Sequence, residues 1–324
     1  MNKIDVGIIN YNGGESLLRC VSSLIAQTET VRIFVFDNNS KDNSIKHLKE
    51  TNWNVQITES KKNSGYAFAC NSLLKNMTAE LQVLCNMDLE FDENFAENLL
   101  KNSRLFPNAS AFASLVIEKS GKVNALGVRF NKELFAENEA SGKDISEVSL
   151  QTKEVFGCYG AVMAFRKEAI KKVGFLDASF FLFFEETEWF FRFQLAGLKT
   201  IFCPNQKVFH ERSLTTVRYS PRKLFYSERN RIRTAFRLLP FSEILKLPFY
   251  AFRRYLKMSA SMPEADGNGK KNSKGLIILT LIKAWINAYL LFPKEFFIRL
   301  KYKKRFGNVP QKTMQILKLY PIEK

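Results

Sequence analysis

Short apolar runs alternate with stretches of helical spacing along the first third of the chain. The four runs expected as strands are 3–9, 31–36, 55–58 and 81–85. The three stretches in which apolar residues recur every three or four positions, as in helices, are 15–27, 44–50 and 66–76. This alternation predicts an α/β fold with a mostly parallel, Rossmann-like sheet and helices on both faces.

Beyond residue 90 the pattern becomes less regular. The further strands expected are 111–117, 123–130, 200–204, 208–210 and one that follows a glycine-bearing turn at 157–160. The further helices expected are 167–173, 222–238, 242–258 and one whose last part is 99–105. Residues 136–148 are polar and are expected to form a loop. Residues 262–274 combine glycine with polar residues and are expected to be a flexible linker.

Composition narrows the class of protein. Apolar residues make up 46% of the 324 residues, which is ordinary for a globular protein, and 30 phenylalanines are unusually many. The five cysteines are dispersed without a CxxC pair, which favours reduced thiols in a cytosolic protein. The apolar run at the N-terminus is too short for a secretory signal and is interpreted as a first strand.

Positive charge is concentrated in the last third. Residues 216–324 hold 24 Lys and Arg against 6 Asp and Glu, whereas residues 1–215 are nearly neutral. This asymmetry predicts two regions, 1–215 and 216–324, and an anionic partner for the second: a membrane surface, a phosphate-bearing substrate or nucleic acid.

The stretch 276–292 is apolar except for Thr280, Lys283 and Asn287, and a polybasic segment follows it. Seventeen residues are marginal for a bilayer span, which needs ~20. A helix lying in the membrane interface is the favoured interpretation. A buried core helix with a basic tail is the alternative, and a span stays open.

Polar side chains stand where strands are expected to end, the edge at which α/β sheets bind ligands. Asp88 follows a buried strand and can bridge a divalent cation to a diphosphate, or it caps a turn. Asp37 can accept hydrogen bonds from a nucleobase or ribose, or it belongs to an ordinary Asx-rich turn. His210 can complete a metal site with Asp88, or it is structural.

A run of five mostly aromatic residues, 180–184, leads into Glu185, Glu186 and Glu188. The carboxylates suit the first turn of a helix, where the helix dipole favours negative charge, and Glu188 and Arg192 are i,i+4 neighbours. The same stretch also offers a catalytic carboxylate.

The order of these segments carries more information than any one of them. The segments in question are Ile8–Asn12, Asp37–Ser44, Asn63–Asn71, Asn86–Asp88, Gly160–Ala161, Val173–Asp177, Phe183–Arg192, Ala196–Gly197, Pro204–His210 and Tyr226–Asn230. In this order and spacing, residues 3–230 resemble family 2 glycosyltransferases of the GT-A fold, in particular the bacterial rhamnosyltransferase-like branch.

The resemblance implies an inverting transfer of a sugar from a nucleotide-diphosphate-sugar donor, assisted by Mg²⁺ or Mn²⁺. Asp88 and His210 would contact the metal, and Glu186 would be the base, with Glu185 as the alternative. The donor side would comprise Asn10, Tyr11, Asn12, Asp37, Asn39, Asn63, Gly65, Asn71, Asn86 and Asp88. The acceptor side would comprise Gly160, Ala161, Glu188, Trp189 and Arg212.

The acidic motif departs from the family pattern, since Glu-Glu-Thr-Glu stands for Glu-Asp-x-Asp and Asn86 stands for the first metal aspartate. A noncatalytic glycosyltransferase-like scaffold is therefore an alternative, and a nucleic-acid-binding protein is another. The favoured hypothesis is a peripheral enzyme on the cytoplasmic face of a bacterial membrane. It would act on a lipid-diphosphate-linked glycan in O-antigen, capsule or related polysaccharide synthesis.

Overall fold

A computed structural model of the chain describes residues 3–211, 220–261 and 274–322, which belong to two compact units. The first unit draws on 1–129, 137–181 and 186–214, and the second on 130–136, 182–185 and 215–324. The division into domains at residue 215 stays a prediction. The predicted linker lies outside the described residues except for Lys274, which begins a helix.

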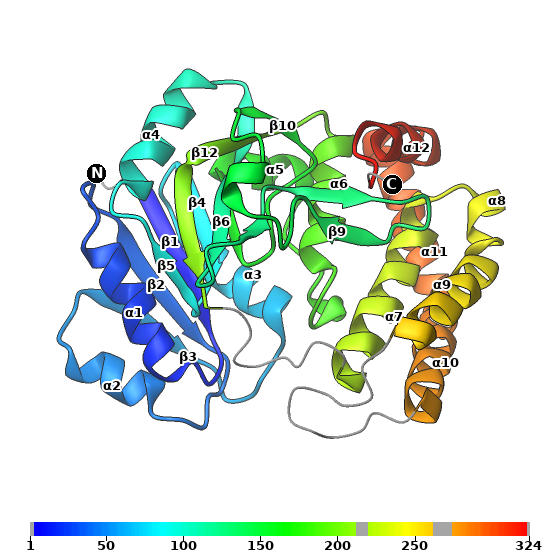
Figure 1. Cartoon of the computed structure of the whole chain (residues 1–324), viewed down its shortest axis with the longest axis horizontal. Coiled ribbons are helices and arrows are strands. Elements are labelled where there is room, and N and C mark those ends of the chain that lie inside the picture. Colours follow the sequence, from blue (N-terminus) through cyan, green and yellow to red (C-terminus); the bar gives the residue numbers. More distant parts are fainter. Residues whose placement is uncertain (1–2, 212–219, 262–273, 323–324) are drawn as a thin grey trace. The chain divides into compact units, whose positions relative to one another are not determined.

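The first unit is built on a ten-stranded sheet (Figure 1). Along the sheet the strands are β10 (Lys153–Val155), β12 (Lys199–His210), β6 (Ala109–Glu118), β11 (Val162–Arg166), β4 (Leu81–Asn86), β1 (Ile4–Asn10), β2 (Arg32–Asp37) and β3 (Val55–Glu59). Two short strands, β5 (Leu89–Phe91) and β7 (Val123–Ala125), pair with β12 and β6.

Most of the sheet runs in one direction. β1 pairs in parallel with β2 and β4, β2 with β3, and β6 with β12. Because β11 is antiparallel to both β4 and β6, these two strands also run the same way. Six strands therefore end at the same edge, as the predicted mostly parallel α/β sheet requires.

Helices cover both faces of this sheet. On β1, β4 and β11 the aligned residues Val6, Val83 and Ala164 belong to one hydrophobic core. That core contains buried residues of α1 (Gly14–Ile25), α2 (Ser44–Glu50) and α4 (Phe95–Leu105). On the opposite face, Gly7 lies against α3 (Tyr66–Asn76) and Phe165 lies against α6 (Glu185–Leu195).

Phenylalanine fills the space beneath α6, which explains part of its abundance. Trp189 is fully buried, with its ring centroid 5.0 Å from that of Phe165 and 4.9 Å from that of Phe193. Its indole N–H donates to the carbonyl of Gly174, so its one polar atom is satisfied. This cluster fixes the helix that carries the glutamates of the acidic motif.

The second unit is helical. Its helices are α7 (Pro221–Leu238), α8 (Phe241–Ile244), α9 (Leu247–Ser261), α10 (Lys274–Leu290), α11 (Phe292–Phe306) and α12 (Val309–Leu319). α7 packs against α10 and α11 (Figure 1). Glu295 of α11 is fully buried and accepts hydrogen bonds from Arg233 and Arg237 of α7. Part of the positive charge of this region is therefore structural.

Among the described residues, no single helix has the length and apolar character of a bilayer span. Gly275–Leu290 and Phe292–Phe306 reach that length and composition only when taken together, across a bend of 57°.

Several expected elements differ from those observed. The strand expected at 123–130 is broken at Leu126–Gly127 into β7 and β8 (Val128–Phe130), and β8 pairs with β9 (Ala136–Asn138) inside the expected loop. The expected strands 200–204 and 208–210 are one strand, β12, with an irregular register between Cys203 and Lys207. The helix expected at 242–258 divides into α8 and α9, and the basic tail is mostly the helix α11.

We expect Glu295→Ala to lower the free energy of unfolding of the full chain by about 3–5 kcal/mol, because Arg233 and Arg237 would stay buried without their shared carboxylate. Denaturant unfolding followed by circular dichroism measures this loss. The control is Glu243→Ala, which removes the exposed 2.8 Å pair with Lys246 and should cost less than about 1 kcal/mol. Equal losses in the two variants would contradict the role given to Glu295.

Candidate active site

The sheet brings most of the predicted site residues to its carboxyl edge. Asn10 and Asp37 are register partners at the ends of β1 and β2, and Asn86 ends β4 beside them. Gly160 and Ala161 precede the antiparallel β11, so they reach the same edge, and the amide of Asn86 donates to the carbonyl of Ala161. Residues at the ends of four strands therefore surround one region.

Asp37 is buried and organises the loop after β2. One carboxylate oxygen accepts from Asn10 Nδ2 at 2.8 Å and from the Ser40 hydroxyl at 2.5 Å, and the other accepts from the amide of Ser40. Asn12 and Asn39 adopt positive φ, which asparagine tolerates better than most residues. These hydrogen bonds make the loop rigid. The groups that Asp37 binds in this structure are therefore groups of the protein itself.

The remaining donor-side residues shape the neighbouring loops. Asn63 Oδ1 accepts from the amide of Gly65, while Tyr11 is half-buried. Asn71 makes two hydrogen bonds to the backbone of Leu176, donating to its carbonyl and accepting from its amide. Asn71 is therefore a tether between α3 and the loop before α6.

Asp88 and His210 lie together, as the sequence suggested. His210 Nε2 is 3.3 Å from Asp88 Oδ2, and both side chains are buried. Among the described residues, Asp88 Oδ1 has no hydrogen-bond partner. A buried carboxylate oxygen without a donor suits a cation.

A residue that the sequence analysis missed sets the tautomer of His210. Asn124 Oδ1 lies 2.9 Å from His210 Nδ1, and Asn124 Nδ2 donates to Glu118 at 3.3 Å. With the amide oriented by Glu118, Nδ1 carries the proton and Nε2 offers a lone pair toward Asp88. One oxygen and one nitrogen ligand thus fit a divalent metal, although the described residues contain no cluster of three or more His, Cys, Asp and Glu suited to a metal.

A charged cluster next to His210 was also missed. Glu211 accepts from Ser16 at 2.6 Å, from Lys119 at 2.8 Å and from Arg19. The hydrogen bonds from Lys119 and Ser16, together with Arg19, lower the pKa of Glu211 to about 2. These contacts join α1 to the end of β12 and so fix the strand end that carries His210.

Glu186 lies against the glycine turn at the sheet edge. A Cβ on Gly160 would come within 2.9 Å of Glu186 Cγ and 3.1 Å of its Oε1, so a larger residue there would displace the Glu186 side chain. The Tyr66 hydroxyl donates to the carbonyl of Gly160 at 2.7 Å and thereby holds the turn in place. Glu186, Gly160 and Tyr66 form a wall that also includes Phe181, whose carbonyl accepts from the Tyr66 amide.

The environment of Glu186 suits a base. Burial raises the pKa of Glu186, and hydrogen bonds from its own amide, the Thr187 amide and the Thr187 hydroxyl oppose that shift only in part. A carboxyl whose pKa is raised is a stronger base once ionised.

The other acidic-motif residues have structural surroundings. Glu188 is fully buried and accepts two hydrogen bonds from Arg192, whose Nη1 donates to the carbonyls of Val173 and Phe175. Trp189 is in the core, and Glu185 is buried. Of the predicted acceptor-side residues, Gly160 and Ala161 lie at the edge of the sheet, while Arg212 lies outside the described residues.

The segment before α6 has unusual backbone geometry. Phe181, Phe183 and Phe184 have φ of 69°, 65° and 73°. A left-handed conformation costs an L-residue other than glycine about 1–2 kcal/mol. Gly65 makes room for this segment, since a Cβ there would lie 2.4 Å from the carbonyl oxygen of Phe181. Strain of this kind persists only where surrounding contacts impose it.

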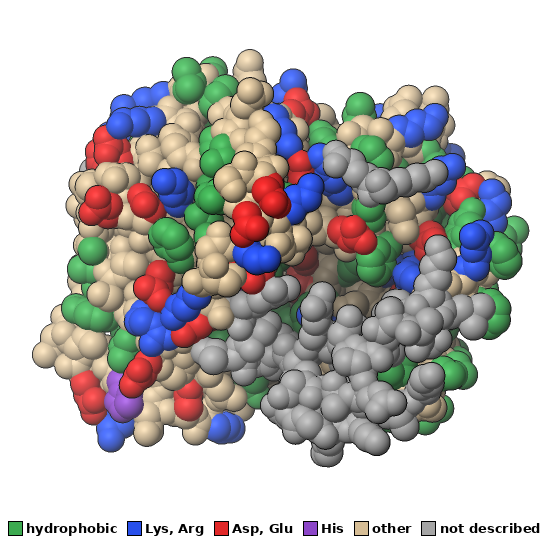
Figure 2. Space-filling view, viewed as in Figure 1, with side chains coloured by type: hydrophobic (Ala, Val, Ile, Leu, Met, Phe, Trp, Pro, Cys, Tyr) green, Lys and Arg blue, Asp and Glu red, His purple; other side chains and the backbone are tan. Residues whose placement is uncertain are grey.

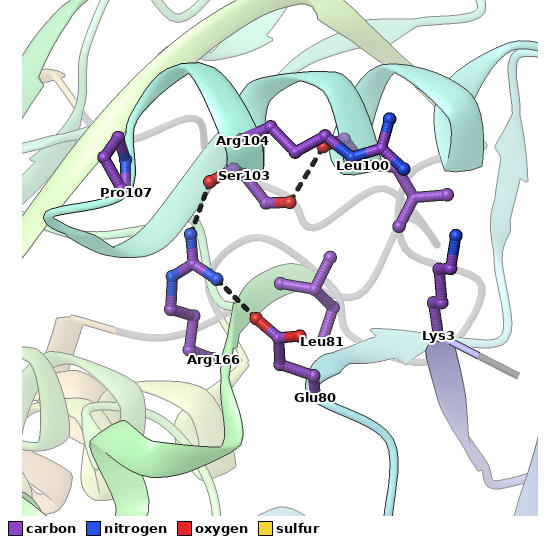
Figure 3. A pocket seen from close by; sticks show the side chains of 8 residues that line it. All are labelled: Lys3, Glu80, Leu81, Leu100, Ser103, Arg104, Pro107 and Arg166. Atoms are coloured by element: carbon purple, nitrogen blue, oxygen red, sulfur yellow. Dashed lines mark hydrogen bonds and ion pairs between the residues drawn. The ribbon is translucent and has the colours of Figure 1, made fainter. Parts of the chain in front are cut away.

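A pocket of about 390 Å³ lies at the other edge of the sheet (Figure 3). Lys3 precedes β1, Leu81 begins β4 and Arg166 ends the antiparallel β11, so this pocket faces the amino ends of the parallel strands. Arg166 is held there by Glu80 at 2.7 Å and by the carbonyl of Ser103. The pocket is separate from the candidate active site.

Comparisons with known proteins identify the family and the fold. Residues 5–174 match the model of glycosyl transferase family 2. The chain is 21% identical over 239 residues to N-acetylglucosaminyl-diphospho-decaprenol L-rhamnosyltransferase of Mycobacterium tuberculosis, covering 66% of this chain and 78% of the relative. It is 29% identical over 178 residues to poly(ribitol-phosphate) β-N-acetylglucosaminyltransferase TarP of Staphylococcus aureus, covering 53% of this chain and 51% of the relative.

The fold is likewise shared with a solved structure. The crystal structure of GalNAc-T7 with UDP, GalNAc and Mn²⁺ aligns with a TM-score of 0.61 at 15% identity, over 94% of this chain and 58% of that protein. Because the family model covers more than half of the sequence, the chain belongs to glycosyl transferase family 2 and is a glycosyltransferase with a GT-A fold.

Proposed function

We propose that the chain transfers a sugar, with inversion, from a nucleotide-diphosphate-sugar to a hydroxyl of a lipid-diphosphate-linked glycan in bacterial surface polysaccharide synthesis. The observation that carries this proposal is the position of Glu186, whose carboxylate lies against Gly160 at the carboxyl edge of the sheet. The bacterial relatives, named as a diphospho-decaprenol rhamnosyltransferase and a poly(ribitol-phosphate) glycosyltransferase, support the class of acceptor. The nucleic-acid alternative is not favoured.

Each step of an inverting displacement has a side chain suited to it. Glu186 takes the proton from the acceptor hydroxyl, because burial makes its carboxylate a strong base. Asp88 and His210 would hold Mg²⁺ or Mn²⁺, which when bound neutralises charge on the departing diphosphate. The rigid Asp37 loop, with Asn10, Asn12 and Asn39, would receive the nucleoside. Asn63, Gly65 and Asn86 would line the donor side at the same edge.

We further propose that the second unit binds the cytoplasmic face of the membrane through α10 and α11. Thr280, Leu281, Ala284 and Ala288 are the buried side of α10, which packs on α7. The exposed side carries the apolar residues Leu279 (48% exposed), Ile282 (50%), Ile286 (57%) and Leu290 (74%). An exposed apolar stripe of this kind suits the acyl boundary of a bilayer.

The charges around this stripe suit anionic lipids. Lys283, Lys294, Lys301, Lys303 and Lys304 are all exposed. Among the described residues from 220 onward, the acidic residues are Glu228, Glu243 and Glu295, and each is paired with Arg or Lys. In the view of Figure 2, hydrophobic and basic side chains predominate over α8 and the beginning of α9. A surface with apolar and basic groups and little opposing charge matches an anionic membrane.

We expect Glu186→Gln to reduce transfer about 10²–10⁴-fold without lowering the melting temperature. Ionised Glu186 destabilises the folded state above the pKa of the unfolded chain, because its folded pKa is raised, and the neutral isostere removes that penalty. Release of nucleoside diphosphate from a panel of UDP-, GDP- and dTDP-sugars with Mn²⁺, together with thermal unfolding, measures both effects. Glu185→Gln is the control and should lose less than about tenfold, within the range of a supporting interaction.

The same assay over a range of pH tests the state of the base. Activity should fall as the pH drops through the raised pKa of Glu186, so the acid limb of kcat/KM lies above the ~4.3 of an ordinary glutamate. Thr187→Val removes a hydroxyl that donates to Glu186 at 3.5 Å and should move the limb higher still. A limb at the ordinary glutamate position in both proteins would exclude Glu186 as the base.

We expect Asp88→Asn and His210→Ala each to abolish Mn²⁺ binding in the presence of UDP or GDP, measured as free Mn²⁺ by electron paramagnetic resonance. Asn124→Ala should weaken binding about 10–100-fold, since it releases the tautomer of His210 but keeps both ligands. Unchanged Mn²⁺ affinity in the His210 variant would show that the metal has other ligands.

We expect the chain to bind vesicles that contain phosphatidylglycerol. A variant with Lys301→Glu, Lys303→Glu and Lys304→Glu should bind them at least ~100-fold more weakly, because each lysine contributes about 1 kcal/mol to binding. Vesicle sedimentation at two salt concentrations measures this. Lys171→Glu in α5 (Lys167–Val173) is the matched control on the first unit and should bind as the wild type does. Self-association that persists without vesicles and is lost in an Ile282→Glu variant would instead assign the stripe to a second copy.

A further inference from the structure

The turn before α6 is held by one buried side chain of α7. Asn230 is fully buried, and its Nδ2 donates to the carbonyl oxygens of Leu182 at 3.0 Å and Phe183 at 2.7 Å. Its Oδ1 accepts from Arg229 Nε at 3.0 Å, which orients the carboxamide so that Nδ2 faces the turn. Arg229 is itself held in place, because its guanidinium carbon lies over the ring of Tyr226, 4.8 Å from the centroid.

The two carbonyls that Asn230 binds lie on either side of Phe183. Their peptide units connect Leu182 to Phe183 and Phe183 to Phe184, so the hydrogen bonds restrict the dihedral angles of both phenylalanines. Both residues have positive φ, and α6 begins at the next residue. Phenylalanine disfavours this conformation, so the turn would relax toward negative φ without an external restraint.

We propose that Asn230 is a positioning residue for sugar transfer: its carboxamide holds Phe183 and Phe184 in the left-handed conformation and so fixes the backbone that leads directly into Glu185 and Glu186. This inference rests on the proposed function. A side chain needed only to fill the core would not have to donate to two carbonyls of a strained turn. An apolar residue of the same size would serve that purpose.

The first test is Asn230→Ala. Turnover of the active nucleotide-sugar should fall about 10–100-fold, because a small displacement of a catalytic group has an effect of this order. The KM for the donor should stay within about twofold, since the donor loops are untouched, and the acid limb of the pH profile should move with the new surroundings of Glu186. Asn230→Asp, which keeps the size but replaces the donor by an acceptor, should behave in the same way.

The second test separates backbone restraint from packing. Phe184→Gly and Phe184→Ala both remove the ring, but only glycine adopts positive φ without strain. If Asn230 restrains the turn, Asn230→Ala should reduce kcat several-fold less in the Phe184→Gly background than in the Phe184→Ala background. Hydrogen exchange of the amides of residues 182–186 should rise in Asn230→Ala, a readout that does not need activity.

The outcomes distinguish this inference from the function on which it rests. If Asn230→Ala lowers the melting temperature but leaves kcat and the acid limb of the pH profile unchanged, Asn230 has a structural role only. If Asn230→Ala reduces kcat equally in the Phe184→Gly and Phe184→Ala backgrounds, Asn230 does not restrain the turn, and the inference is likewise overturned. If the wild type turns over no nucleotide-sugar at all, the proposed function fails and this inference fails with it. If Glu186→Gln behaves as expected while Asn230→Ala is fully active, only this inference fails.

Discussion

The parallel register of β1 with its two neighbours is the constraint on which the rest of the site depends. It sets Asn10 beside Asp37 and Ile9 beside Asn86, so three loops separated by dozens of residues open at one edge. A slip of one residue in this register would turn each side chain to the opposite face of the sheet. The antiparallel β11 then places the Gly160 turn at that same edge, and β12 ends there with His210. Catalytic groups from distant parts of the chain meet because the sheet fixes where each strand stops.

The sequence was informative where local signals decide structure. Apolar runs followed by Asp37 and Asp88 identified strand ends, and spacing identified the helices between them. It was uninformative where long-range contacts decide. Asn124 orients His210 only because β7 pairs with β6, and nothing in the local sequence around Asn124 indicates that role. The left-handed phenylalanines run against residue preference, so no propensity argument predicts them. Likewise, Tyr66 lies within the segment Asn63–Asn71, but its hydrogen bond to Gly160 exists only in the fold.

Environment separates glutamates that the sequence presents as equivalent. Glu188 is saturated by Arg192, which ties it to two backbone carbonyls and makes it part of the scaffold. Glu186, two residues earlier, meets a glycine turn and has a raised pKa because burial outweighs the few donors around it. The same carboxyl group therefore serves as an anchor at one position and as a candidate base at the other. The acidic motif can depart from the usual Glu-Asp-x-Asp pattern without losing that distinction, since it depends on neighbours rather than on side-chain length alone.

The charge of the last third also divides into two populations that composition cannot distinguish. Arg231, Arg233, Arg237 and Arg299 are buried, where they bind Glu228, Glu295 or backbone carbonyls and hold the helices together. The lysines of α10 and α11 are exposed beside apolar side chains. Arginine suits the first role because its planar fork makes several fixed hydrogen bonds, and lysine suits the second because its flexible stem keeps the ammonium hydrated. Nucleic-acid readout relies on arginine and polar side chains directed at phosphates and base edges. Among the described residues from 220 onward, these four arginines are internal and the exposed lysines of α10 and α11 lie beside an apolar stripe, a combination that suits the headgroup region of a bilayer.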